Sequence, residues 1–380
     1  MNREALYLSL LLLSLACHRN PPSNRQTAKP AEISFARYAS GFEVEVCSGY
    51  SLLHVYNPWQ NSQGVSFSYV LSEDPGLVPD SLSHLLYIQT PVHRVITLST
   101  THVAMIDQLG KQATIKGISG SGFIYLPELR NRLEEGKVSD VGYDQGLSYE
   151  SIVALQPDVL FMYGVEGSVL ASAQKLAELD VPVVFCGDYL EAHPLGKAEW
   201  IRFFARFYKR EKEADYFFNR IDSLYHAHKT LAARAREQPL VLTGLPWKDT
   251  WYMAGGNSFA ARFIEDAGGR YLWSDHPSSQ AVPMDLESVY ARAVNAQVWI
   301  NPGAAASLDH LRKFDERFKN LAVLQSGRVY NNNARLNTSG GNDYWESGAV
   351  RPDLVLQDLI KVFHPDLMTD HSFIYYRQLK

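Results

Sequence analysis

The chain has 380 residues, of which 46% are hydrophobic and 20% are charged. This length accommodates two core-forming domains, and the composition is too apolar for a disordered chain. The formal net charge of −5, without a dense Lys/Arg run, excludes nucleic acid as a partner, because that function needs a basic face. The 7 Trp and 21 Tyr offer large flat surfaces for cores or for ring stacking.

The first 17 residues have the pattern of an export signal. Arg3 precedes the apolar run ALYLSLLLLSLA, which is too short to span a bilayer as a helix. The run ends at Ala16-Cys17, which is similar to a bacterial lipobox, where the Cys is acylated and becomes the new N-terminus. Residues 18–33 are polar and contain Pro, as a flexible tether would. We therefore expect an exported protein on the periplasmic side of a membrane, lipid-anchored in the cell envelope through Cys17; a buried N-terminal helix is the alternative.

Two cysteines remain after this signal, Cys47 and Cys186. Two cysteines do not make a disulfide framework, and no C-x-x-C spacing indicates a metal site. We expect two unpaired core thiols, although the sequence leaves a disulfide between them open.

Residues 34–89 are predicted to form a β-rich extension. The stretches EVEVCSGYSLLHVYN and VSFSYVL are rich in β-branched and aromatic residues, and they are bounded by the turn-like segments NPWQNSQG and EDPG. The pattern leaves open whether the extension braces the neighbouring domain or adds a contact surface.

Residues 90–193 alternate between strands and helices. Short apolar strands are predicted at RVITL, TIKGIS, DVLFMYG and VPVVFCG, and helices at HVAMIDQLG, SYESIVALQ and SVLASAQKLAELD. Such alternation is typical of a mainly parallel sheet covered on both faces by helices. We therefore predict an α/β N-terminal lobe.

The segment 194–236 interrupts this alternation. Its apolar residues recur mostly at gaps of three, four or seven, which predicts a long helix with one buried face, either continuous or broken near residues 209–212. From 237 to 380 the α/β alternation resumes with LVLTG, SFAARFIEDAGG, LESVYARAV, QVWINPG and LVLQDLIKVFH. In both halves a Glu-Ser pair opens a short helix that leads into an apolar strand. The sequence therefore predicts two Rossmann-like lobes joined by a long α-helix, with a ligand cleft between them.

Four stretches carry a family resemblance that covers about residues 92–365: RVITLSTTHVAMIDQLG, DVGYDQGLSYESIVALQPDVLFMYG, YMAGGNSFAARFIEDAGGRYL and PMDLESVYARAVNAQVWINPG. Together they resemble the cobalamin- and ferric-siderophore-binding proteins of ABC importers, whose lobes are joined by a rigid helix. The resemblance implies a monomeric substrate-binding lipoprotein that captures a metal chelate, such as a ferric siderophore, haem or cobalamin. It also implies delivery to an ABC permease dimer with its ATPase subunits, with no catalytic residue, cofactor or metal of the protein's own.

The resemblance assigns permease docking to Glu150 and Glu287, which open the two duplicated helices. In the cobalamin-binding member of the family, a surface Glu on each lobe docks onto Arg residues of the permease. A carboxylate at a helix start also complements the helix dipole, and that ordinary role is the alternative for both residues.

The candidate ligand-binding residues follow the predicted strands, because the ligand crevice of an α/β sheet lies beyond the carboxyl ends of its strands. These positions are Thr101, Tyr143, Tyr163, Trp247, Trp251, Tyr252, Gly303, Asn332, Arg335 and Asp343. The resemblance places aromatic or Gly contacts to a macrocycle at four of them, Tyr143, Tyr163, Trp247 and Gly303. Aromatic faces suit a large planar ligand, while Arg and Asn side chains suit carboxylate or amide rims.

An enzyme is the main competing class. The stretch GISGSG does not satisfy G-x-S-x-G, and neither H-E-x-x-H, Walker A nor G-x-G-x-x-G occurs. The loop carboxylates Asp144, Glu166, Asp188 and Glu191 are interpreted as solvated, and the lone His102 as a capping or packing residue. A secreted hydrolase and a surface adhesion or scaffold lipoprotein remain the alternatives to a binding protein.

Overall fold

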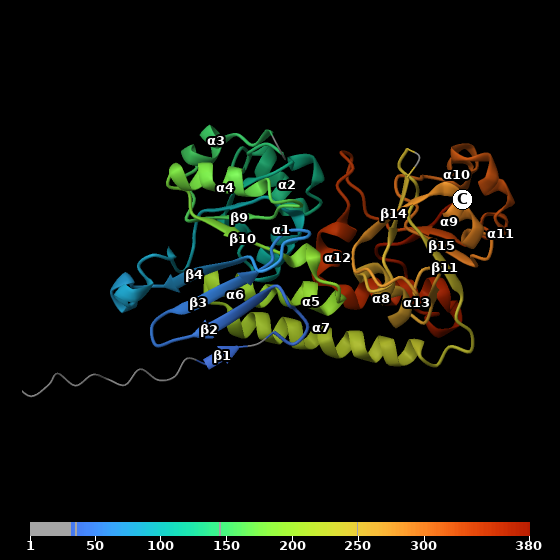
Figure 1. The fold of residues 1–380 in the computed structure, drawn as a ribbon, viewed down its shortest axis with the longest axis horizontal. Coiled ribbons are helices and arrows are strands. Elements are labelled where there is room, and N and C mark those ends of the chain that lie inside the picture. Colours follow the sequence, from blue (N-terminus) through green and yellow to red (C-terminus); the bar gives the residue numbers. More distant parts are fainter. Residues whose placement is uncertain (1–31, 35, 144–145, 249) are drawn as a thin grey trace, which may run out of the picture.

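The computed structural model describes residues 32–34, 36–143, 146–248 and 250–380. The predicted signal, Cys17 and nearly all of the predicted tether lie outside these residues, as does Asp144. Two α/β lobes stand side by side, with the extension against one of them and the long helix α7 (Glu211–Ala232) running beneath both (Figure 1). The predicted two-lobed α/β architecture is confirmed.

The N-terminal lobe is built on a five-stranded parallel sheet in the order β10-β9-β6-β7-β8. Its strands are short and apolar, and every residue of β9 is buried, as expected for a sheet with both faces covered. The strands are β6 (Val95–Thr97), β7 (Ile115–Ile118), β8 (Ser139–Asp140), β9 (Val159–Met162) and β10 (Val183–Phe185). The helices are α1 (Thr100–Gln108), α2 (Pro127–Glu134), α3 (Tyr149–Ala154) and α4 (Val169–Glu178).

The C-terminal lobe repeats this design with the strand order β13-β11-β15-β16-β17, parallel except at the last pair. Its sheet comprises β11 (Leu240–Thr243), β13 (Arg270–Tyr271), β15 (Val298–Ile300), β16 (Val329–Asn331) and β17 (Arg377–Gln378). Its helices are α8 (Phe259–Asp266), α9 (Leu286–Ala293), α10 (Leu308–Phe314), α11 (Ala322–Gln325), α12 (Ser347–Val350) and α13 (Pro352–Phe363). A separate antiparallel pair, β12 (Thr250–Ala254) with β14 (Ala281–Asp285), was not predicted from the sequence.

The segment 194–236 forms three helices instead of one: α5 (Pro194–Glu199), α6 (Ile201–Tyr208) and α7. Lys209 ends α6 with a left-handed backbone, φ 55°, which breaks the helical path. From α7, Tyr225 donates a 2.8 Å hydrogen bond to the buried carboxylate of Asp266 in α8, and Lys229 forms a 2.7 Å ion pair with it. The join between the lobes is therefore a packed helical layer, of which α7 is the longest element.

The extension is a five-stranded sheet in strand order β1 to β5. Its strands are β1 (Glu32–Ser34), β2 (Phe42–Val46), β3 (Ser51–Tyr56), β4 (Ser66–Ser72) and β5 (Leu86–Gln89), so the first strand begins inside the predicted tether 18–33. Phe42 packs on Trp200 and Phe203, and the Tyr69 hydroxyl accepts a 2.9 Å hydrogen bond from the Phe185 backbone N–H. These contacts show that the sheet braces the N-terminal lobe and α6.

The two cysteines of the described residues are unpaired, Cys186 buried and Cys47 half-buried. In the described part of the chain, no helix has the length and hydropathy needed to cross a bilayer.

Candidate ligand-binding site

A cavity of about 630 Å³ lies between the two lobes, at the carboxyl ends of their parallel strands. The N-terminal lobe lines it with the segments that follow β6, β7, β8 and β9. The C-terminal lobe lines it with the segments that follow β15 and β16, and with the loop that leads to α12. The lining residues are Leu98, Ser99, Thr100, Ser119, Phe123, Tyr143, Tyr163, Asn301, Gly303, Ala304, Asn332, Asn333, Leu336, Gly340, Asn342 and Trp345.

Three aromatic side chains of this cavity are unusually exposed. Phe123 is 49% exposed and Tyr143 52% exposed, and their ring centroids lie 5.2 Å apart. Trp345, from the opposite lobe, is 53% exposed. Large rings that converge on one cavity and remain in water form a surface suited to a flat or bulky ligand. We call Phe123, Tyr143 and Trp345 the cleft aromatics; Phe123 and Trp345 were not among the predicted site residues.

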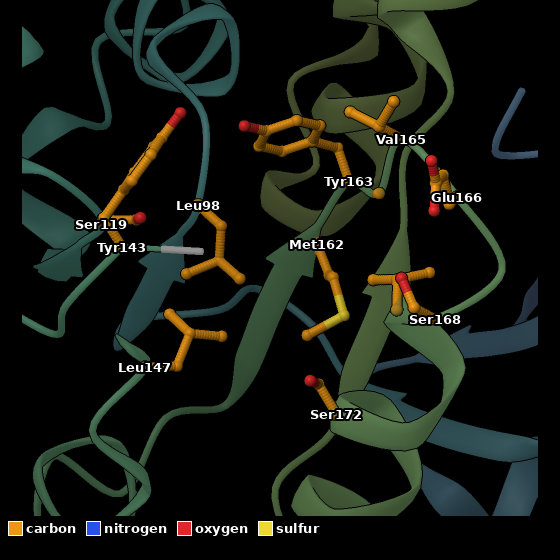
Figure 2. Close-up of a pocket in the computed structure, with 12 residues that line it drawn as sticks. Leu98, Ser119, Tyr143, Leu147, Met162, Tyr163, Val165, Glu166, Ser168 and Ser172 are labelled. Atoms are coloured by element: carbon orange, nitrogen blue, oxygen red, sulfur yellow. The ribbon is translucent and has the colours of Figure 1, made fainter. Parts of the chain in front are cut away.

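A second cavity of about 560 Å³ adjoins the first, with which it shares Leu98, Ser119, Tyr143 and Tyr163. Figure 2 shows the hydroxyl ends of Tyr143 and Tyr163 pointing toward one another, with Leu98 and Met162 below the two rings in this view. The Tyr163 ring also meets the ring of Tyr189 edge-on, with 6.0 Å between the centroids. The two adjoining cavities therefore combine apolar side chains with phenol rings.

The C-terminal lobe contributes mainly amides. Gly303 turns its loop with a left-handed backbone, φ 52°. The side chain of Asn331 fixes that loop, because its Nδ2 donates to the carbonyls of Gly303 (2.9 Å) and Ala305 (3.0 Å). Asn332 and Asn333 follow β16 and face the cavity. This side of the cleft offers hydrogen-bond donors and acceptors without charge.

Among the described residues that line these two cavities, the only charged side chain is the exposed Glu166. The prediction that Arg335 and Asp343 line the cleft is wrong. Arg335 Nε lies 3.0 Å from Asp343 Oδ2, and its guanidinium lies over the Tyr125 ring, 5.2 Å from the centroid. The ion pair borders a separate cavity of about 90 Å³. The buried carboxylate of Asp343 needs a cationic partner. Because Arg335 fills this role, its guanidinium does not line the cleft.

Thr101 does not line the cleft either, because its side chain points inward from α1. Its Oγ1 donates a 2.7 Å hydrogen bond to Asp188, whose other carboxylate oxygen lies 3.3 Å from His102 Nε2. Burial acts to raise the pKa of Asp188, but the bonds from His102 and Thr101 hold it below its usual value. Both Asp188 and His102 are buried and belong to the core, so Asp188 is not a solvated loop carboxylate.

The predicted aromatic cluster at 247–252 is divided between three environments. Trp251 is wrong as a cleft residue, because it is fully buried, donates to the Thr243 carbonyl and packs on Trp299. Tyr252, its neighbour on β12, faces the other way and is 53% exposed beside a third cavity. Trp247 is 63% exposed, with the Lys248 ammonium 4.3 Å from its ring, and lines neither of the two cavities described above.

Two polar side chains of the C-terminal lobe bind the backbone of the N-terminal lobe beside the cleft. Asn337 Nδ2 donates to the carbonyls of Gly122 (3.1 Å) and Ile124 (2.6 Å). The Glu346 carboxylate accepts from the backbone N–H groups of Tyr125 and Leu126, each at 2.8 Å. We call Asn337 and Glu346 the interlobe clamp. It was not predicted, because each side chain is separated from its partners by more than two hundred residues in sequence.

Glu346 makes the stability of the fold depend on pH. Burial raises its pKa to about 7, with Asp343 and Asp107 acting in the same direction against the two backbone hydrogen bonds. An unfolded Glu titrates at about 4.3. Because the folded state holds the proton more tightly, this group lowers the unfolding free energy as pH rises from about 4.5 to 7, by up to about 3 kcal/mol.

Urea denaturation of the wild type and Glu346→Gln at pH 5 and pH 8 measures this effect. The glutamine at position 346 cannot titrate. The wild type is therefore expected to lose more stability than the variant when the pH rises from 5 to 8. Other titrating groups are common to both proteins and cancel. Equal pH dependence of the two proteins would contradict the assignment.

The two glutamates predicted to dock on a permease lie in different lobes. Glu150 is exposed in the first turn of α3, after the N-cap Ser148. Glu287 occupies the same place in α9 and forms a 2.8 Å ion pair with Arg317, which lowers its pKa. The duplicated helices therefore present one carboxylate each, and only the second has an arginine of its own chain among the described ion pairs.

The chain is similar in sequence to a known protein family and to an archaeal lipoprotein. A family model for periplasmic binding proteins matches residues 95–336. An uncharacterized lipoprotein of Methanocaldococcus jannaschii is 28% identical over 304 residues, which cover 76% of this chain and 70% of that protein.

Solved structures share the fold at low sequence identity. A periplasmic heme-binding protein from Pseudomonas aeruginosa is 17% identical with a TM-score of 0.57, over 76% of this chain and 98% of that one. An ABC-type Fe3+-hydroxamate transport protein from Saccharomonospora viridis is 17% identical with a TM-score of 0.54, over 72% and 94% of the two chains. The matched family region, 95–336, leaves the β-rich extension outside.

Proposed function

The chain belongs to the periplasmic binding protein family, and from this we propose that it captures a metal chelate between its lobes and delivers it to an ABC importer. The observation that carries the proposal is the set of cleft aromatics, three half-exposed rings from both lobes on one cavity of about 630 Å³. A cavity of this size accommodates a small organic ligand, and exposed rings gain free energy when a ligand removes them from water.

The lining favours an uncharged chelate. A ligand carboxylate enclosed in this space would lose water without meeting a cation among the described lining residues, and such burial is unfavourable. Amides from Asn332 and Asn333 instead suit amide or hydroxyl groups on the ligand. An uncharged ferric hydroxamate therefore fits better than haem with its two propionates. Cobalamin is neutral overall but carries one phosphate, and it fits if that phosphate stays in water.

Haem is the second candidate, because two phenols border the cavity. Tyr143 and Tyr163 both line it, and a Tyr oxygen is a known axial ligand of haem iron. Protein-supplied iron ligation would offset part of the cost of burying the propionates.

Delivery and anchoring complete the proposal. The Ala16-Cys17 sequence and the lipoprotein relative support a lipid anchor on the periplasmic side of the cell envelope. Glu150 and Glu287, one on each lobe, would meet arginines of a two-subunit permease. Capture and release need no bond-breaking chemistry, and the packing of the extension on the N-terminal lobe gives this sheet a role within a binding protein.

Intrinsic fluorescence titration of the purified protein tests this function. Cyanocobalamin, an uncharged ferric trihydroxamate and haem are added separately, and quenching is followed because Trp345 lines the cavity. We expect at least one uncharged chelate to quench the fluorescence saturably. Its affinity should be at least about tenfold higher than that of haem. Tighter binding of haem would select the second candidate, and no saturable quenching by any of the three would overturn the proposed function.

A further inference from the structure

A third cavity, of about 550 Å³, joins the extension to both lobes. Its walls are the loop 57–63 between β3 and β4, the segment 189–192 after β10, and the C-terminal lobe at 252–260 and 279–281. Figure 1 shows the β3–β4 end of the extension reaching the gap between the lobes. This is the only one of the described cavities that includes residues from all three parts of the chain.

The loop 57–63 is held in place by the N-terminal lobe. The Gln60 backbone N–H donates to the Val165 carbonyl at 3.1 Å, and the Trp59 ring packs against Phe185 with 5.8 Å between the centroids. Asn57 closes the loop, because its backbone N–H donates to the Val65 carbonyl while its Oδ1 accepts from the Val65 N–H. The backbone of the loop is therefore anchored to the N-terminal lobe and forms one wall of the cavity.

This wall lies next to the proposed ligand space. The Val165 carbonyl that Gln60 binds belongs to the segment lining the second cavity. Tyr189 lines the third cavity, and its hydroxyl donates a 2.7 Å hydrogen bond to the carbonyl of Gly164, which lines the second. A ligand that fills the cleft and extends past Tyr163 would reach the loop.

The exposed side chains of the third cavity are polar and uncharged. Its exposed side chains include the amides of Gln60, Asn61 and Gln63, and the half-exposed Tyr252. Its one charged residue is Glu191, which is buried and accepts hydrogen bonds from Ser40, Gly41 and Trp200. Such walls suit carboxamide or hydroxyl groups that can stack on or beside a phenol ring.

We propose that the β3–β4 loop of the extension is part of the ligand site and recognises an uncharged, amide- or hydroxyl-bearing arm of the chelate. This inference rests on the proposed function. It explains how a segment outside the family match adds specificity: the two lobes hold the bulky part of the chelate, and the loop with Tyr252 holds the arm. A chelate without that arm gains nothing from the loop.

Two variants of the full chain test the proposal, Gln60→Ala/Gln63→Ala and Tyr252→Ala. Matched controls are Gln89→Ala, an exposed glutamine of the same extension, and Tyr216→Ala, an exposed tyrosine of α7; neither is among the residues lining the third cavity. The probes are an uncharged ferric trihydroxamate that bears a pendant carboxamide arm, the same ferric trihydroxamate without that arm, and cyanocobalamin, each titrated against wild type and all variants.

We expect each test variant to weaken an arm-bearing chelate by about tenfold, with the controls unchanged. The ferric trihydroxamate without the arm should bind the wild type and all variants equally. If the wild type binds the arm-bearing chelate and both test variants bind it with the same affinity, this inference is overturned and the proposed function is left intact. Failure of the wild type to bind any probe would overturn the proposed function and the inference with it.

Discussion

Replacing Tyr143 and Trp345 together with alanine is expected to weaken chelate binding by about 100-fold, as measured by the same titration. The two rings come from opposite lobes and are each about half exposed in the empty cleft. Each contributes burial and stacking energy only when the ligand is present, on the order of 1.5 kcal/mol per ring. Since they lie on different lobes, the single losses of about tenfold should add.

The matched control is Tyr216→Ala, which removes a ring that is 73% exposed on α7. Its affinity should equal that of the wild type. All these rings are exposed, so the urea midpoint of every variant should stay close to the wild-type value. A double variant that keeps its affinity within about threefold would show that Tyr143 and Trp345 do not bind the ligand.

Reversing the charge of both docking residues, Glu150→Lys with Glu287→Lys, is expected to reduce chelate uptake by about tenfold or more. An exposed carboxylate that meets an arginine at an interface sets orientation and encounter rate, and a like charge there is repulsive. Uptake is measured in vesicles that hold the cognate importer. Ligand affinity in solution should not change, because both residues lie outside the described cavities.

The control for this pair is Glu178→Lys with Glu265→Lys, one exposed glutamate on each lobe. Glu265 is a close match for Glu287, because each forms an ion pair with an arginine of its own lobe, Arg262 at 3.2 Å and Arg317 at 2.8 Å. The control has the same change in net charge and should transport normally. Normal uptake by the Glu150/Glu287 variant would remove the docking assignment.

The fold was predictable because its signals are local. Strands such as β9 are continuous apolar runs, and helices such as α1 and α9 begin at Ser99 and Asp285, whose side chains cap them. The interlobe segment is the exception, since its apolar spacing continues past Lys209 although the left-handed backbone there ends α6. Helical periodicity alone does not reveal such a break.

The site was predictable only where position along a strand decides which way a residue faces. Tyr143, Tyr163, Gly303 and Asn332 follow strands and do line the cleft. Other assignments depended on side-chain direction or on distant partners. Trp251 and Tyr252 are adjacent on β12, so they face opposite sides, and the sequence does not say which one faces inward.

Charge at the site depends on contacts that the sequence does not show. Arg335 is drawn from the cleft by Asp343, eight residues later in a loop, and Glu346 binds backbone groups at Tyr125 and Leu126 in the other lobe. The partners of a buried carboxylate are the groups that the fold brings close to it, and these can be distant in sequence. The uncharged character of the cleft therefore appears only in three dimensions.

The most direct test of a chelate held between the lobes is an anomalous difference map from crystals of the protein grown with its tightest-binding chelate, collected at the absorption edge of the metal. The account predicts one strong metal peak inside the interlobe cavity, with ligand density touching Tyr143 from one lobe and Trp345 from the other. A peak on the outer surface of a single lobe, or an empty cleft in crystals of the saturated protein, would contradict it.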